Sequence, residues 1–382
     1  MVRFPKKLAQ KLEKRKVDDA LRVLSEPKGL IDFSSNDYLG FSKKTQFHGS
    51  AVELLEERKL HKNGATGSRL LTGNHTLYKE LEDFLIAHHS SESALVFNSG
   101  YDANIGFFSS VPQRGDTVLY DEWAHASIRD GIKMSNAKGY KFKHNDIDDL
   151  SVHIERNQNL KDSEIYVVTE SVFSMDGDSP DLEALADFCT KKDCNLIVDE
   201  AHATGIYGNG RDLVSQLGLE ENVFARIITF GKALGNHGAA ILGSNDLRTY
   251  LVNFARSLIY TTALAPYAVA STLEAYKYLE KEGKKEGRKL QENIQYFKQQ
   301  INLLKIEGRF IESSSAIHCL VVPGNEKVKE VAKYLNVEGF DVKPILSPTV
   351  RIGQERLRFC LHSYNTKEEI LRILSTTRNF IK

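Results

Sequence analysis

The segment Ile227-Ile-Thr-Phe-Gly-Lys-Ala-Leu-Gly-Asn-His-Gly-Ala-Ala-Ile-Leu-Gly243 places one lysine, Lys232, between two apolar runs. The runs are typical of the end of one buried strand and the start of another, so we predict that Lys232 lies on a tight loop between two strands. Burial lowers the pKa of a lysine amine, and a neutral amine can attack a carbonyl to form a Schiff base. The alternative is an ordinary surface lysine in a glycine-rich turn.

A second segment lies about thirty residues upstream, where an apolar strand ends in acidic residues: Asn195-Leu-Ile-Val-Asp-Glu-Ala-His-Ala-Thr-Gly205. Ligands of open α/β sheets bind outside the carboxyl ends of the strands, so Asp199 is expected to face the same crevice as Lys232. Pyridoxal phosphate enzymes require this pair, because the lysine holds the aldehyde and the carboxylate keeps the pyridine nitrogen protonated. The letters Asp-Glu-Ala-His also occur in nucleotide-hydrolysing helicases, but the chain has no GxxxxGK[ST] phosphate loop.

The composition favours small-molecule chemistry. A chain of 382 residues can form one large α/β domain and a smaller one. The charge is balanced, with 51 basic and 51 acidic residues, which gives no electrostatic reason to expect a nucleic acid or a membrane surface as partner. We also expect no metal ion.

The four cysteines, the N-terminus and the hydropathy predict a soluble cytoplasmic protein. Cys189, Cys194, Cys319 and Cys360 show no CxxC spacing and lie in or beside apolar runs, as reduced core residues do. The N-terminus lacks the apolar stretch of a signal peptide, and nowhere do about 18 apolar residues run together.

We predict an N-terminal arm at residues 1–48, a large domain at 49–285 and a small C-terminal domain at 286–382. Residues 4–25 space their apolar side chains as an amphipathic helix does. Strands then alternate with helices through residue 243, which predicts a mainly parallel sheet with helices on both faces. A long charged helix from Pro266 to about residue 305 leads into a smaller α+β domain, with strands at 317–322 and 357–361 and a helix near 326–337.

Two further places on the large domain have the chemistry of a site. The strand that begins at Ala94 runs into a helix through Ser99, Gly100 and Tyr101, whose backbone amides are candidates for holding a phosphate. Such junctions also occur without a ligand. His125 follows the strand at 117–120 and could stack on a flat cofactor ring, although a lone histidine is more often a satisfied polar residue.

Seven motifs together resemble the α-oxoamine synthase family of pyridoxal phosphate enzymes, in the family's order: Ser34–Gly40, Gly67–Leu70, Asn98–Tyr101, His125–Ser127, Glu170–Asp178, Asp199–His202 and Thr229–Lys232. The resemblance extends from about Leu21 to Leu361. It implies the pyridoxal phosphate transferase fold of type I, an α/β fold with a large mainly parallel sheet domain and a smaller C-terminal α+β domain.

The resemblance also implies roles for individual residues. Lys232 would carry the cofactor and remove the amino acid's Cα proton, Asp199 would pair with the pyridine nitrogen, and His125 would stack on the ring and meet the substrate. His202 would form a hydrogen bond with the ring hydroxyl. The other cofactor positions would be Ser99, Gly100, Tyr101, Ser174, Thr229 and Thr262, and the other substrate positions would be Arg22, Asn36, Thr349 and Arg358.

The implied reaction is a decarboxylative condensation of an amino acid with an acyl thioester. The stretches Thr229–Gly235 and Leu258–Thr262 favour L-alanine and a pimeloyl thioester, on coenzyme A or on an acyl carrier protein, in biotin synthesis. The resemblance also implies a homodimer, with Tyr260–Thr262 reaching the partner's cofactor.

Alternatives remain at this stage. The sequence departs from the family pattern at Ser171, Leu346 and Leu264–Pro266, mostly on the acyl side of the site. A 2-amino-3-oxobutyrate ligase, a 5-aminolevulinate synthase or a serine palmitoyltransferase would share the cofactor residues. An aminotransferase would release no carbon dioxide. A binding or regulatory subunit is the third alternative, and the presence of Lys232 with Asp199 argues against it, because such homologues lack the lysine.

Overall fold

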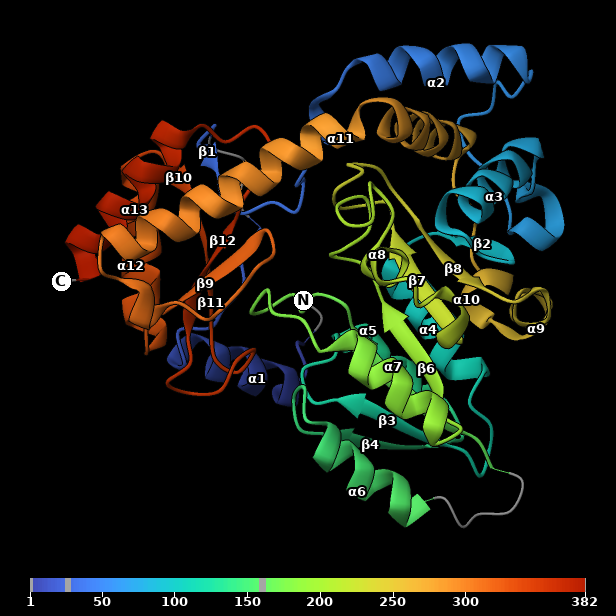
Figure 1. Ribbon diagram of the computed structural model, residues 1–382, viewed down its shortest axis with the longest axis horizontal. Coiled ribbons are helices and arrows are strands. Elements are labelled where there is room, and N and C mark those ends of the chain that lie inside the picture. Colours follow the sequence, from blue (N-terminus) through green and yellow to red (C-terminus); the bar gives the residue numbers. More distant parts are fainter. Residues whose placement is uncertain (1–2, 25–28, 158–162, 382) are drawn as a thin grey trace. The chain divides into compact units, whose positions relative to one another are not determined.

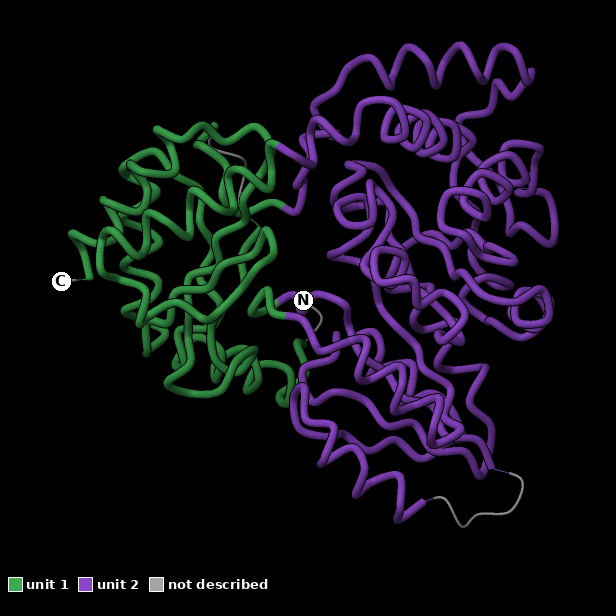
Figure 2. The backbone as a smooth tube through the Cα atoms, in the orientation of Figure 1, with its two compact units in different colours: residues 1–35, 175–178, 289–382 green, residues 36–174, 179–288 purple. Residues whose placement is uncertain are grey.

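The computed structural model describes residues 3–24, 29–157 and 163–381 (Figure 1). The chain forms two compact units, here called the smaller and the larger unit (Figure 2). The smaller unit comprises residues 1–35, 175–178 and 289–382, and the larger unit comprises residues 36–174 and 179–288. The division into an arm at 1–48 and domains at 49–285 and 286–382 remains a prediction.

The larger unit is built on a seven-stranded sheet with the strand order β2-β8-β7-β6-β5-β3-β4. Strand β8 is antiparallel to β2 and β7, and the other four neighbouring pairs are parallel. The predicted mainly parallel sheet is therefore confirmed. The strands are β2 (Ser93–Phe97), β3 (Thr117–Asp121), β4 (Lys138–Phe142), β5 (Ile165–Glu170), β6 (Asn195–Asp199), β7 (Ala225–Thr229) and β8 (Ala239–Gly243).

Helices cover both faces of this sheet because side chains alternate along each strand. Along β5, Tyr166 and Val168 join the core on one face, whereas Ile165 and Val167 join the core on the other. The first core packs against α4 (Gly100–Ser110), α5 (Ala126–Met134), α9 (Asn245–Phe254) and α10 (Arg256–Ile259). The second packs against α6 (Ile147–Asn157), α7 (Leu182–Lys191) and α8 (Leu213–Leu217).

Two more helices of the larger unit, α2 (Gln46–Glu57) and α3 (Thr76–His89), precede β2. Helix α11 (Pro266–Leu303) includes residues of both units, and the charged run 281–288 lies in its middle. The long charged helix that links the two parts of the chain is confirmed.

The smaller unit is an α+β unit, as predicted. Strands β11 (Lys343–Ile345), β12 (Arg356–Cys360) and β9 (Ile317–Val321) form an antiparallel sheet, and β1 (Ile31–Asp32) pairs in parallel with β10 (Phe340–Asp341). Helices α12 (Asn325–Val337) and α13 (Lys367–Ile381) belong to it. The segment 175–178 joins this unit through the buried ion pair of Asp176 with Arg356 and through the Ser313 hydroxyl, which donates to the Gly177 carbonyl (2.8 Å).

The N-terminal helix α1 (Lys6–Val17) is shorter than the apolar pattern over residues 4–25 indicated. It ends before Asp19, which has a positive φ of 48° that an α-helix cannot continue through. No residue of α1 is buried, and Leu8 and Leu12 are each 46% exposed. Its apolar face therefore stays largely exposed in the described part of the chain.

All four cysteines are free, as expected, and Cys189, Cys319 and Cys360 are buried. Burial raises the pKa of the Cys319 thiol to about 12, which keeps that thiol protonated and unreactive. No helix in the described ranges has the length and hydropathy needed to span a membrane.

Candidate active site

The carboxyl ends of the central parallel strands carry a group of polar side chains. Glu170 ends β5 and Asp199 ends β6, and the two residues are paired in register. Thr229 ends the neighbouring strand β7, and Lys232 follows it. His125 begins α5 shortly after β3, and the charges of Asp199 and Lys232 both act on its imidazole. The structure thus brings together the lysine, the carboxylate and the histidine at the edge where ligands bind.

The loop that carries Lys232 is closed by its own backbone. The N–H of Phe230 donates to the Gly238 carbonyl (2.9 Å), and the N–H of Asn236 donates to the Phe230 carbonyl (2.8 Å). Gly235 has a φ of 59°, and a Cβ there would lie 2.2 Å from the backbone nitrogen of Ser42, so the position requires glycine. The predicted tight loop between two strands is found, with Lys232 half-buried on it.

Asp199 is held in place from two sides. Its Oδ1 accepts from the Ala201 N–H (3.0 Å), and its Oδ2 accepts from Nδ2 of Asn104 on α4 (2.9 Å). The residue is 5% exposed. A buried carboxylate with fixed acceptor geometry suits a role beside a protonated ring nitrogen.

His125 is exposed as a whole residue, and the partial burial of its imidazole is the main cause that lowers its pKa. Lys232 and Arg129 also lower this pKa, whereas Asp199 raises it, and the net direction favours the neutral imidazole at pH 7. The backbone N–H of His125 donates to Oε1 of Glu170 (2.7 Å). Burial and the neighbouring Asp199 charge raise the pKa of the Glu170 carboxyl to about 8, so this acid is mostly protonated at pH 7. The sequence reasoning did not single out Glu170, although a quoted motif begins with it.

His202 is positioned by a residue that the sequence reasoning also missed. Its Nδ1 lies 2.7 Å from the hydroxyl of Tyr38, which donates to Oδ1 of Asn36 (3.1 Å). Because that hydroxyl hydrogen goes to Asn36, the Tyr38 oxygen accepts from His202. Tyr38 therefore connects two predicted site residues that are far apart in sequence. Its membership of the quoted motif Ser34–Gly40 was the one available signal.

The N-terminus of α4 lies beside Thr229. A Cβ on Gly100 would lie 3.7 Å from the Thr229 hydroxyl oxygen. Ser99 caps the helix, since its hydroxyl accepts from the Asp102 N–H (3.1 Å) and donates to Oδ2 of Asp102 (2.8 Å). The side chain of Tyr101 turns to α5, where its hydroxyl donates to Asp130 (2.9 Å). The free amides of this helix start can hold an anion.

Thr262 lies close to α4 in the same chain. Its carbonyl accepts from Nδ2 of Asn98 (2.6 Å), and Thr262 itself is exposed. The exposure leaves its hydroxyl accessible to a second subunit.

The remaining predicted positions are distributed over the two units. Ser174 ends a segment of the larger unit. Arg22, Thr349 and Arg358 belong to the smaller unit, where Arg22 and Thr349 are exposed and Arg358 is half-buried on β12. Arg22 lines a cavity of about 470 Å³ with apolar residues of α1.

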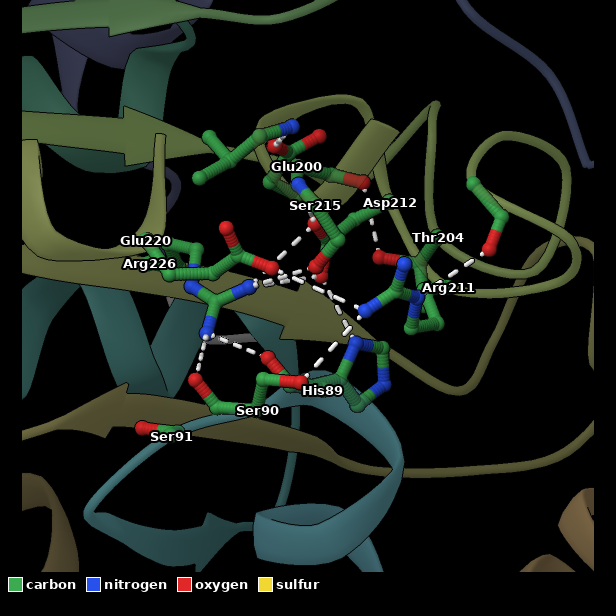
Figure 3. A network of polar contacts seen from close by, with 12 residues as sticks. His89, Ser90, Ser91, Glu200, Thr204, Arg211, Asp212, Ser215, Glu220 and Arg226 are labelled. Atoms are coloured by element: carbon green, nitrogen blue, oxygen red, sulfur yellow. Dashed lines mark hydrogen bonds and ion pairs between the residues drawn. The ribbon is translucent and has the colours of Figure 1, made fainter. Parts of the chain in front are cut away.

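A buried polar network supports the segment that follows Asp199 (Figure 3). The carboxylate of Glu200 accepts from the N–H of Val214 (2.8 Å) on α8. Asp212 accepts from Nη1 of Arg226 (3.1 Å) and from Nδ1 of His89 (2.7 Å). Burial lowers the pKa of His89 to about 4, so the neutral His89 donates a hydrogen bond to Asp212. Arg226 is therefore the cation that pairs with the Asp212 carboxylate. This network ties the turn that follows Asp199, which carries His202, to the start of α8.

The sequence comparisons agree with this arrangement. A family model described as aminotransferase class I and II matches residues 28–376, so the chain belongs to that family. It is 40% identical over 373 residues to 8-amino-7-oxononanoate synthase of Emericella nidulans, covering 93% of this chain and 90% of the relative. It is 36% identical to the enzyme of the same name from Haemophilus ducreyi, covering 91% of each chain.

Solved structures give the same result. A serine palmitoyltransferase from S. paucimobilis with bound PLP superimposes with a TM-score of 0.88 at 26% identity, covering 98% of this chain and 96% of the other. An 8-amino-7-oxononanoate synthase from Francisella tularensis superimposes with a TM-score of 0.76 at 28% identity, covering 92% and 98%. The resemblance to the α-oxoamine synthases is confirmed, and the protein is a pyridoxal-phosphate-dependent acyltransferase similar to the 8-amino-7-oxononanoate synthases.

Proposed function

We propose that the enzyme condenses L-alanine with a pimeloyl thioester to give 8-amino-7-oxononanoate, carbon dioxide and free thiol, in biotin synthesis. The observation that carries the chemistry is the meeting of Lys232, Asp199 and His125 at the carboxyl edge of the sheet. The names of the relatives support the particular substrates. The acyl group is carried by coenzyme A or by an acyl carrier protein.

The described residues of the larger unit fit pyridoxal phosphate. The start of α4 offers amides and a glycine at Gly100 for the phosphate, together with Ser99, Tyr101 and Thr229. Asp199 would accept from the ring nitrogen, and His202 would form a hydrogen bond with the ring hydroxyl through its Nε2. His125 would cover the ring face, and Ser174 would complete the cofactor contacts. When bound, the cofactor supplies an electron sink for the carbanion formed at the amino acid's Cα.

The chain's own groups perform the proton transfers. The amine of Lys232 would hold the cofactor, and once freed it would take the Cα proton as a general base and return a proton after carbon dioxide has left. The neutral imidazole of His125 donates a hydrogen bond to the substrate. Arg358 pairs with a substrate carboxylate, and Arg22, Asn36 and Thr349 line the substrate position.

A single assay tests the substrates. The enzyme is incubated with alanine, glycine or serine against acetyl, succinyl, pimeloyl and palmitoyl thioesters, and thiol release is followed. Alanine with pimeloyl should be fastest, and glycine should lose only several-fold because it lacks one methyl contact, worth about 1 kcal/mol. Faster turnover of glycine with acetyl would overturn the substrate assignment and favour a 2-amino-3-oxobutyrate ligase.

Serine palmitoyltransferase is the second candidate, because the solved structure with that name superimposes with the higher of the two TM-scores. Serine carries a hydroxyl that a pocket shaped to alanine leaves without a partner. The same assay separates the two candidates, because a serine palmitoyltransferase would release thiol faster with serine and a palmitoyl thioester than with alanine and a pimeloyl thioester.

A further inference from the structure

A continuous chain of hydrogen bonds joins Asp199 to His125: the bonds of Asn104 are buried, and the last bond, from Ser127 to the exposed residue His125, is partly buried. Nδ2 of Asn104 donates to Oδ2 of Asp199 (2.9 Å) and to the hydroxyl of Ser127 (3.0 Å). The Ser127 hydroxyl lies 2.7 Å from Nδ1 of His125. Asn104 is 2% exposed and Ser127 is 0% exposed, so water does not compete for the bond between these two residues.

The hydrogen-bond donors of Asn104, Ser127 and His125 have only one consistent arrangement. An amide oxygen of Asn104 facing Asp199 would repel the carboxylate, so the amide nitrogen lies there. The Ser127 hydroxyl accepts from that nitrogen, and its own hydrogen is directed to Nδ1 of His125. The backbone N–H of Ser127 also donates to Nδ1 (3.3 Å). Nδ1 is therefore an acceptor, and the neutral imidazole carries its proton on Nε2.

Close packing of two helices makes the chain of bonds possible. Gly131 on α5 faces α4, and a Cβ there would lie 2.8 Å from Cβ of Phe108 and 3.0 Å from the Asn104 carbonyl oxygen. The missing side chain lets the helix with Ser127 approach the helix with Asn104. The arrangement also leaves Oδ1 of Asn104 buried without a hydrogen-bond partner among the described residues. A stability role alone does not explain this unpaired atom.

We propose that Asn104 and Ser127 are positioning residues that tie His125 to Asp199 and hold its imidazole in the Nε2–H form. The N–H of that form is the donor that His125 presents to the substrate. This inference rests on the proposed function for its catalytic consequence, whereas the tautomer itself does not depend on the substrate.

The tautomer is measured by nuclear magnetic resonance of isotope-labelled histidine in the holoenzyme, with His125→Gln to assign the signal. The wild type should show the Nε2–H form at neutral pH. Ser127→Ala, which removes a single hydroxyl, should shift the Nδ1 resonance and admit the other tautomer, and Asn104→Ala should change it in the same direction. Ser110→Ala is the matched control, since that hydroxyl on α4 donates only within its own helix, to the Gly106 carbonyl. A wild-type Nδ1–H form, or a signal that Ser127→Ala leaves unchanged, would overturn the proposal.

Kinetics supply the second measurement. Ser127→Ala should lower kcat by about tenfold, because the loss of one hydrogen bond raises the activation barrier. Cofactor affinity should change less than twofold, because Asn104 still holds Asp199. An equal loss of kcat and cofactor affinity would indicate general damage and count against the proposal. If the wild type fails to turn over alanine and pimeloyl thioester, the proposed function fails, and the tautomer measurement still decides the positioning role.

Discussion

At the scale of single residues, the proposed chemistry depends on Lys232, which lies half-buried on a loop closed by backbone hydrogen bonds. Borohydride reduction and peptide mapping should find the pyridoxyl group on Lys232. Lys232→Ala should keep weak cofactor binding through the start of α4 and lose turnover by about 10³-fold or more, because both the covalent link and the base are removed. A pyridoxyl group on another lysine would refute the assignment.

Glu170 makes a pH-dependent contribution at the same scale. Its pKa is raised from 4.5 to about 8, with burial as the main cause, so the folded protein keeps a proton that the unfolded chain releases above pH 4.5. Its contribution to stability therefore falls as the pH rises from about 4.5 to 8. Glu170→Gln keeps an oxygen for the His125 N–H and has no carboxyl to titrate.

The Glu170→Gln variant should be more stable than the wild type by a margin that grows with pH, at most about 1.4 kcal/mol per pH unit. Urea denaturation at pH 5, 6, 7 and 8 measures the margin. A difference that stays constant over this range would show that Glu170 titrates alike in the folded and unfolded states.

At the scale of elements, the buried pair of Arg226 and Asp212 joins β7 to the start of α8. The two side chains are 4% and 0% exposed, and Asp212 also caps α8 by accepting from the Ser215 N–H (2.7 Å). Replacing Arg226 by leucine would leave the Asp212 charge buried without its cation.

Arg226→Leu should lower the free energy of unfolding by about 3–5 kcal/mol. Chemical denaturation measures the loss. Lys191→Met is the control, because its ion pair with Asp187 is exposed and its loss should change stability very little. Equal effects of the two substitutions would mean that the buried pair is not a structural support.

At the scale of the whole molecule, exposed apolar residues predict a second subunit. Leu71 is 80% exposed and Tyr260 is 73% exposed, and their segments are joined by the bond from the Ala263 N–H to the Gly67 carbonyl (2.9 Å). Exposed apolar side chains that lie together mark interaction surfaces. Thr262 lies in the same region, which agrees with its proposed role at the partner's cofactor.

We expect a homodimer that persists on dilution, as obligate interfaces of about 2,000 Å² or more do. Leu71→Asp should produce monomers in sedimentation velocity, whereas Val337→Asp, at an exposed apolar residue of the smaller unit, should not. Thr262→Ala and Lys232→Ala subunits that are co-expressed, or unfolded and refolded together, should recover activity, because one site of the mixed dimer has both residues intact. An active wild-type monomer would disprove the dimer.

The sequence determined the elements because their signals are local. Period-two and period-3.6 patterns extend over a few residues, so the strands at the sheet's centre, the helix that begins at Thr76 and the long helix from Pro266 were predictable. The same holds for the residues that follow strand ends, since parallel strands place Asp199 and the loop of Lys232 at one edge of the sheet.

Only the tertiary structure decided which side chains support that edge. Tyr38 and His202 are separated by 164 positions, and Asn104 and Asp199 by 95, so no local pattern connects them. Their contacts depend on helix packing and on the direction of individual hydrogen bonds. The raised pKa of Glu170 likewise follows from burial beside Asp199, a property of the assembled sheet. The candidate reacting groups were therefore predictable from the sequence, whereas the residues that orient them became known only from the tertiary structure.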